Sequence, residues 1–192
     1  MVGFGYKQAW LAVRDGDPAA VIAALGLRDL GTVSWRVGGD LAYLTQDRLV
    51  LTPLLPGARG GRWLLVAGRW LLLNAGKVDI AALSATLDTE VQFFATYRVI
   101  ELHRWERAIG GRTVRAFEYI GERGEVTDWR GDPDPVETAI GLPPARPEAS
   151  GEALRPSSCA SRSFAAATDW RRSRMSAMPD HAIASSTTIA TA

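Results

Sequence analysis

Residues 101–119, ELHRWERAIGGRTVRAFEY, bring one of the chain's two histidines close to several carboxylates. His103 lies two residues after Glu101, and Glu106 and Glu118 follow on the same stretch. A carboxylate can orient an imidazole and raise its pKa, which suits a general acid or base near neutral pH. Acid–base chemistry is therefore one hypothesis for this stretch.

The Gly-Gly pair at 110–111 predicts a two-residue hairpin turn, because the favoured hairpin turns require positive φ angles that glycine adopts freely. Counting back from this turn places Glu106 opposite Arg115 and His103 opposite Glu118. Side chains alternate between the two faces of a strand, so His103 and Glu118 are expected on the same face.

Two functions remain open for this face. In the first, His103 with Glu118 or Glu101 forms the acid/base pair of a small hydrolase or transferase. No G-x-S-x-G stretch accompanies it, and no Ser, Cys or Thr nucleophile stands at a recognisable elbow. In the second, which we favour, the face binds another protein through Glu101, His103, Trp105 and Arg107. Tryptophan and arginine are enriched at the energetic centres of protein interfaces, and the charges around Trp105 predict that it is partly exposed.

Composition narrows the classes of function. The formal net charge is +1, and within the first 144 residues basic residues do not cluster with aromatic ones on any one element, so nucleic-acid binding is not expected. With one cysteine and two histidines, the chain is expected to hold no metal site, and no cofactor motif is present. The most apolar run, residues 63–73, is too short for a membrane span. We expect a cytoplasmic protein with no membrane partner.

Three short helices are expected, because an aspartate suited to an N-cap precedes each one. The predicted signals are Asp17 with Pro18 and a stop at Gly26, Asp79 within 77–88, and Asp134 with Pro135 and Glu137 within 134–141. The last set forms a capping box with proline at the first helical position.

Most other segments of the first 144 residues carry strand signals. The predicted strands span 4–13, 32–37, 41–45, 48–55, 62–73, 90–109, 113–121 and 124–129, and a hairpin turn is predicted around Gly57–Gly61. Many short strands without regular strand–helix alternation predict an α+β fold with a mainly antiparallel sheet and two or three short helices.

The character of the sequence changes near Pro143. Residues 1–144 are predicted to form a single α+β domain. Residues 145–192 are rich in alanine and serine and have no sustained periodicity, so they are predicted to be a disordered tail. Translation out of frame in a GC-rich gene is the alternative explanation for this segment.

Residues 91–125, VQFFATYRVIELHRWERAIGGRTVRAFEYIGERGE, resemble a group of uncharacterised bacterial proteins. In that group a segment like F-A-T-H-R-V-x-E-Y-H-x-W-A-R precedes R-A-Y-x-Y-x-G-E-x-G-E. The resemblance covers residues 3–141 and departs at Tyr97 and Leu102, where the group has histidine and tyrosine. It implies a small cytoplasmic module that binds a partner protein, of the immunity type associated with bacterial toxins.

Overall fold

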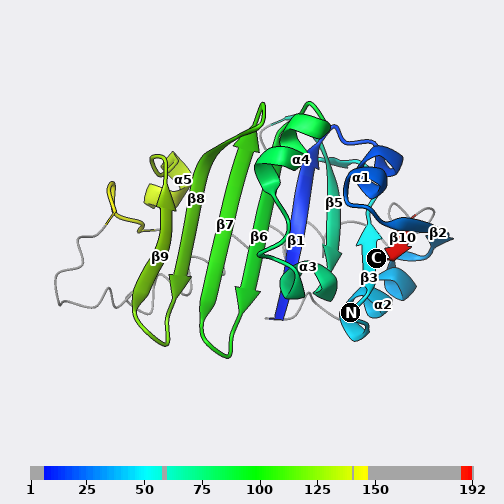
Figure 1. Cartoon of the computed structure of the whole chain (residues 1–192), viewed down its shortest axis with the longest axis horizontal. Helices are drawn as coiled ribbons and strands as arrows, with labels where there is room; N and C mark the ends of the chain where they lie inside the picture. Colours follow the sequence, from blue (N-terminus) through cyan, green and yellow to red (C-terminus); the bar gives the residue numbers. More distant parts are fainter. Residues whose placement is uncertain (1–6, 58–59, 140, 147–186, 192) are drawn as a thin grey trace.

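The computed structural model describes residues 7–57, 60–139, 141–146 and 187–191. They form one ten-stranded sheet in the order β2-β10-β3-β5-β1-β6-β7-β8-β9, with β4 paired to β5 (Figure 1). All strand pairs are antiparallel. The strands are β1 (Lys7–Arg14), β2 (Arg28–Val33), β3 (Arg48–Leu51), β4 (Leu55–Pro56), β5 (Arg62–Gly68), β6 (Val91–Tyr97), β7 (Leu102–Ile109), β8 (Arg112–Ile120), β9 (Glu125–Arg130) and β10 (Thr187–Thr191).

The described residues also include five helices, more than the two or three expected from the sequence. They are α1 (Pro18–Ala24), α2 (Trp35–Leu44), α3 (Arg69–Leu73), α4 (Ile80–Thr86) and α5 (Pro135–Ala139). The prediction of an α+β fold with a mainly antiparallel sheet is confirmed. None of the helices in the described ranges is long and apolar enough to cross a lipid bilayer.

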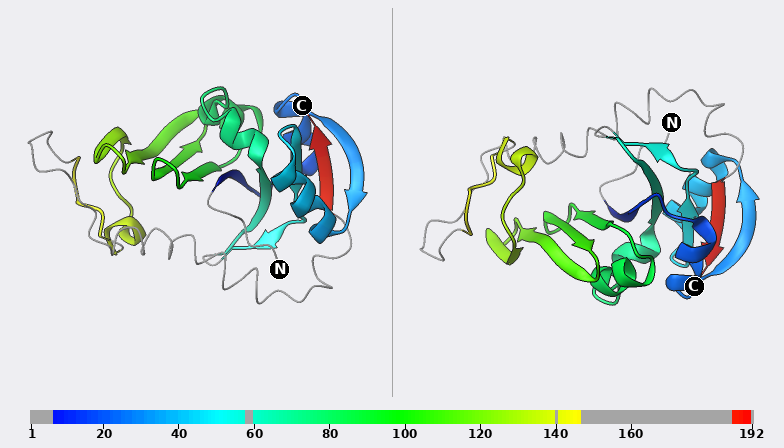
Figure 2. Two further views of the ribbon diagram at one scale, coloured as in Figure 1. Left: turned by 90° about the horizontal axis from the view of Figure 1, so that it is seen from below. Right: turned by 90° about the horizontal axis from the view of Figure 1, so that it is seen from above.

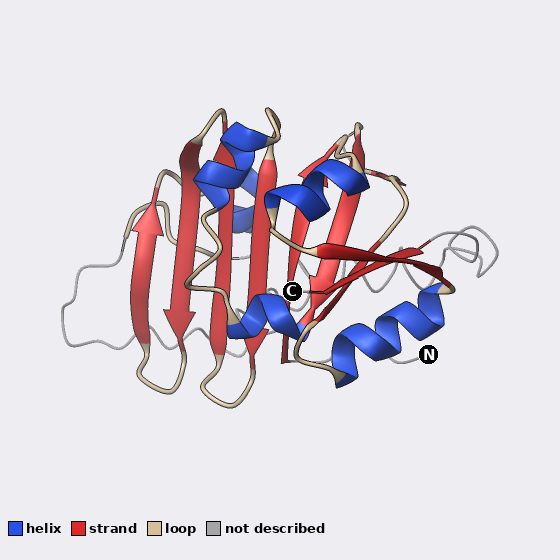
Figure 3. Cartoon of the chain, turned by 45° about the vertical axis from the view of Figure 1, so that its right-hand side comes forward, coloured by secondary structure: helices blue, strands red, loops and turns tan. Residues whose placement is uncertain are grey.

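The central strands are buried on both faces of the sheet, and all six interior residues of β1 are buried. On what we call the first face, Leu11 and Phe93 pack with Val21 of α1, Leu71 of α3 and Leu83 of α4 (Figures 1 and 3). The opposite, second face carries a smaller cluster beneath α2 and an aromatic cluster on β7 and β8. The face of the sheet on which a side chain lies therefore determines which cluster it packs against.

The local helix signals are confirmed. The side chain of Asp17 accepts a hydrogen bond from the backbone N–H of Ala20, and Pro18 begins α1. Asp79 caps α4 in the same way, accepting from the N–H of Ala82 at 2.9 Å. Side-chain caps satisfy N–H groups that have no partner within a helix, so these ends are fixed by short-range chemistry.

Two segments predicted as strands are helical. Residues 32–37 and 41–45 were expected in strands, but residues 35–44 form α2. The predicted strand 62–73 ends at Gly68 and continues as α3. A Cβ on Gly38 would lie 2.8 Å from Cγ2 of Val50, so this glycine lets α2 approach the sheet closely.

The segment 90–109 is not one strand. It divides into β6 and β7 at a turn through residues 98–101. The predicted hairpin around Gly57–Gly61 is confirmed, because Leu55 of β4 lies opposite Trp63 of β5.

The chain's C-terminal segment contains an interior strand of the sheet. β10 pairs with β2 on one side and with β3 on the other, and Figure 2 shows it in red beside β2. Ile189 and Ala190 are buried. The prediction of a disordered tail over 145–192 is therefore wrong for residues 187–191, and the domain does not end at residue 144. Residues 147–186 and 192, and the out-of-frame hypothesis for them, lie outside the described residues.

The burial of β10 leads to a stability prediction. Ile189→Ala is expected to lower the free energy of unfolding by about 2–5 kcal/mol, because deleting a buried aliphatic side chain leaves a cavity. The control is Ile109→Ala, the same change at an exposed hairpin end, expected to cost less than about 0.5 kcal/mol. Denaturant unfolding followed by circular dichroism measures both. If both variants lose equally little free energy of unfolding, β10 is not buried in the sheet.

Candidate functional site

The β7–β8 hairpin and the turn before it carry the residues predicted to act in catalysis or binding. The hairpin turn is as predicted, with Ile109 opposite Arg112 and φ angles of 55° and 76° at Gly110 and Gly111. The register then shifts at a β-bulge. Ala108 lies opposite Thr113, whereas Arg107 lies opposite Arg115. Val114 is the extra residue of β8, and every pair beyond it differs by one position from the prediction.

The shift separates the predicted acid/base pair. His103 lies opposite Tyr119, and Glu118 lies opposite Arg104. Since neighbouring positions on a strand point to opposite faces, Glu118 is on the first face and His103 is on the second. The predicted pairing of His103 with Glu118 is wrong, and so is the pairing of Glu106 with Arg115.

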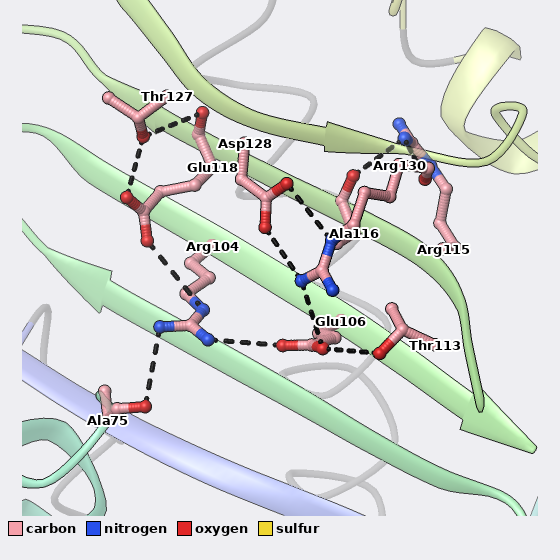
Figure 4. A network of polar contacts seen from close by, with 10 residues as sticks. All are labelled: Ala75, Arg104, Glu106, Thr113, Arg115, Ala116, Glu118, Thr127, Asp128 and Arg130. Carbon is pink, nitrogen blue, oxygen red and sulfur yellow. Dashed lines mark hydrogen bonds and ion pairs between the residues drawn. The ribbon is translucent and has the colours of Figure 1, made fainter. Parts of the chain in front are cut away.

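Glu106 is the centre of a charged network on the first face (Figure 4). Its carboxylate is buried and lies 3.2 Å from Nη2 of Arg104 and 3.2 Å from Nη2 of Arg130. Thr113 Oγ1 donates a third bond to it at 2.9 Å. Two guanidinium groups and a hydroxyl thus solvate a carboxylate that has little access to water.

The same network continues across β8 and β9. Arg130 pairs with Asp128 at 2.9 Å, and Arg104 lies 3.8 Å from Glu118. Thr127 donates to Glu118 at 2.7 Å. The hydrogen bonds that Arg130 donates to Asp128 are the largest cause that holds the pKa of Arg130 above its usual range, and burial opposes this effect.

This first-face network suits recognition better than proton transfer. Each of its three carboxylates, Glu106, Glu118 and Asp128, forms an ion pair with an arginine. Reciprocal pairs also hold the long side chains in one arrangement. The network therefore presents fixed charges of both signs, of which Arg130 and Asp128 are the more accessible.

On the second face, aromatic residues form a row across five neighbouring strands. Their positions lie directly opposite one another in each successive pair. The row is Trp10, Phe94, Trp105, Phe117 and Trp129. The rings of Trp105 and Phe117 stack with centroids 4.2 Å apart. Trp105 is only 7% exposed, so the prediction that it is partly exposed is wrong.

A buried ion pair closes this aromatic cluster. Nε of Arg115 donates to Oε2 of Glu137 at 3.0 Å, and both residues are buried. Glu137 also accepts from Nε1 of Trp105 and from the backbone N–H of Asp134. The guanidinium of Arg115 lies 4.5 Å above the ring of Trp129. The predicted capping box is confirmed, but sequence spacing did not reveal that its glutamate also binds Arg115 in the sheet.

His103 occupies the next row of the second face, between Thr96 and Tyr119. Burial lowers the pKa of His103 below its usual range, and the charge of Glu101 opposes this with a smaller effect. Glu101 is not in a strand. It is an exposed turn residue with φ 50°. The same charge, added to burial, raises the pKa of Tyr119.

Arg107 is the other predicted binding residue that reaches solvent. Its Nε lies 2.6 Å from Oε1 of Glu90, a buried carboxylate that also accepts from Gln92. Of the four predicted binding residues, Glu101 and Arg107 are exposed, whereas His103 and Trp105 are largely enclosed. The structure thus retains only part of the predicted binding surface.

A second candidate surface lies on α2. Val37, Leu41 and Leu44 recur at i, i+4 and i+7 and are 49%, 37% and 72% exposed. Residues at this spacing line one side of a helix, so they form an apolar stripe that we call the α2 stripe. The sequence contains this spacing, but the segment was interpreted as two strands, and the stripe was missed.

Among the described residues, no group of His, Cys, Asp and Glu side chains is arranged to hold a metal ion. Comparison of the chain with protein-family models, with curated proteins and with solved structures finds no match.

The burial of His103 gives a pH prediction. Its lowered pKa means that the unfolded state takes up a proton before the folded state does as the pH falls. Stability should therefore decrease from the usual imidazole pKa of about 6.5 down to the lower pKa of the folded state. Urea unfolding at several pH values measures the slope. His103→Gln should flatten it, and equal slopes in the parent protein and this variant would contradict the assignment.

The Arg115–Glu137 pair gives a second prediction. Glu137→Gln is expected to lower the free energy of unfolding by about 3–5 kcal/mol, because it leaves the buried charge of Arg115 without a counter-ion. Glu122→Gln, at an exposed turn position, is the matched control and should change stability by less than about 0.5 kcal/mol. A Glu137→Gln protein as stable as the control would show that this pair does not hold α5 to the sheet.

Proposed function

We propose that this chain is a non-enzymatic domain that binds another protein through the α2 stripe. The observation that carries the proposal is the exposure of three large aliphatic side chains on one side of a single helix. Scattered exposed apolar residues are common, but a contiguous stripe on a helix is typical of an interaction surface.

The inward side of α2 makes the stripe unusual. Gly38 and Ala42 face the sheet, so the helix places its smallest residues inside and its larger aliphatic residues outside. An ordinary surface helix has the reverse arrangement. A partner with an apolar groove would bury Val37, Leu41 and Leu44 together, which is the way amphipathic helices are recognised.

The arrangement around His103 supports a binding role over catalysis. The proposed acid/base pair with Glu118 is divided between the two faces, and the carboxylates of the first-face network are engaged by arginines. Arg107 and Glu101 remain exposed at the second face and provide an alternative surface for the same partner.

The resemblance over residues 3–141 extends the proposal to an immunity-type inhibitor of a bacterial toxin, acting in the cytoplasm. The single cysteine supports a reducing compartment, because small secreted domains commonly depend on several disulfides. A toxin gene beside the coding gene would favour this form of the proposal, and a metabolic operon would oppose it.

The test is affinity capture with the full chain, followed by titration of the identified partner against variants. Leu41→Ala and Leu44→Ala are each expected to weaken binding by about 1–4 kcal/mol if they form the energetic centre. Leu73→Ala, an exposed leucine on α3, is the control and should bind as the parent does.

Two outcomes would overturn the assignment to α2. If Arg107→Ala weakens binding and the leucine variants do not, the partner binds the second face. If a screened catalytic activity is lost in His103→Gln while that variant stays folded, the enzymatic hypothesis replaces the proposal.

A further inference from the structure

β10 lies between β2 and β3, a position that we call the β2–β3 slot. The path of the chain does not determine whether the strand enters the slot of its own molecule or that of a second copy. Before the strand, Arg146 lies near β9, where its Nη2 is 3.5 Å from the carbonyl oxygen of Val126. β9 is at one edge of the sheet, and β10 is next to the other edge. Seven inter-strand spacings of about 4.8 Å separate them, or roughly 34 Å. Arg146, the last described residue before β10, therefore lies far from the slot that receives the strand.

The slot itself is defined by β2 and β3. Thr188, Ala190 and Thr191 each lie opposite a residue of both neighbours. Within the described residues β2 pairs with no other strand, so β10 alone joins it to the sheet. Ala190 faces the cluster of the first face, and Thr187 lies beneath α2 near Gly38. The slot fits a short strand of small and β-branched residues.

Two features make withdrawal of β10 less costly than that of an ideal central strand. Thr187 is fully buried, and its hydroxyl has no hydrogen-bond partner among the described residues. A buried unsatisfied hydroxyl is a free-energy cost that water removes when the strand leaves. The pairing with β2 also shifts between Thr188 and Ala190, which interrupts the ladder at Ile189.

From this geometry we infer that Thr187–Thr191 of one copy occupies the β2–β3 slot of a second copy, so that the chain forms a strand-exchanged dimer. The occupant is a second copy because the structure shows that this strand fits the slot on both faces and in both ladders. An exchanged strand makes the same contacts as the resident one. Protein concentration then decides between the closed monomer and the exchanged dimer.

Pairing between the edges of two sheets is a poorer route to a dimer. The free edge of β2 carries Arg28, Asp29 and Gly31, the last with φ 94°. Charges, glycine and a bulge are the features by which natural sheets prevent edge-to-edge addition. The interior slot, rather than the edge, is the place where a second copy can add a strand.

A disulfide can report which slot the strand occupies. Arg48 lies opposite Thr191 in the β3–β10 ladder, so the variant R48C/T191C in a Cys159→Ser background places two cysteines across the slot. Strand exchange links two chains covalently, whereas a resident strand links one chain to itself. Oxidation at increasing protein concentration, followed by non-reducing denaturing electrophoresis, separates the two products.

The expected result is a covalent dimer whose ratio to the internally linked monomer rises about tenfold for each tenfold rise in monomer concentration, by mass action. Internally linked monomer alone at every concentration would overturn the inference. Circular dichroism of the reduced variant, compared with the parent, checks that the substitutions preserve the fold.

A second measurement does not depend on cysteine chemistry. Two parent proteins with different affinity tags are mixed at high concentration, incubated and captured through one tag. Strand exchange predicts that the two tagged proteins co-purify. Thr187→Val should slow this exchange, because it removes the buried unsatisfied hydroxyl that makes withdrawal of β10 less costly. Absence of co-purification would overturn the inference. So would a dimer that Leu41→Ala abolishes and that gives no disulfide-linked dimer, since such a dimer forms through the α2 stripe.

Discussion

One extra residue in β8 determines what each side chain of the β7–β8 hairpin contacts. In a strand the side chains alternate between faces, so a register change of one position exchanges the cross-strand neighbour of every residue beyond it. The bulge at Val114 brings Glu118 beside Arg104 and leaves Glu106 free to bridge Arg104 and Arg130. Gly131 is matched to this bulge, because a Cβ there would lie 2.1 Å from the carbonyl oxygen of Val114. Bulges of this kind are built into a fold, and this one orders the charges of the first face.

The buried charges follow from the same register. Glu90, Glu106 and Glu137 are each buried, and each is bound by at least one arginine at 3.2 Å or less. Removing a carboxylate from water is costly unless hydrogen bonds and a counter-ion replace the lost hydration. Each of these carboxylates therefore depends on its own arginine partner. Arg115 and Arg107 lie directly opposite each other, and two separate carboxylates balance them. The result is a sheet in which each of these three buried carboxylates has an arginine partner.

The sequence predicted those features that depend on neighbours along the chain. The caps at Asp17 and Asp79, the Gly110–Gly111 turn and the capping box at Asp134 and Glu137 all rest on contacts within a few residues.

The features that were missed depend on contacts between distant segments. Gly38 lets α2 pack closely on Val50 and Thr187, and no local sequence pattern indicates this contact between distant segments. The five residues of β10 carry strand-forming threonines and an isoleucine, but such a short run is ambiguous without the two strands that receive it. The bulge depends on Gly131, and the burial of Trp105 depends on a helix that follows it by 30 residues along the chain.

The two proposed interactions meet at Gly38. The α2 stripe points outward, while the opposite side of the same helix lies on Val33 of β2, Val50 of β3 and Thr187 of β10. Withdrawing β10 removes part of the surface beneath α2, so the position of the helix depends on an occupied slot. A partner that binds α2 only in its seated position therefore stabilises the occupied slot by the free energy of its binding, whichever copy provides the strand. By reciprocity, strand occupancy strengthens binding at the stripe, because α2 packs directly on the strands that form the slot.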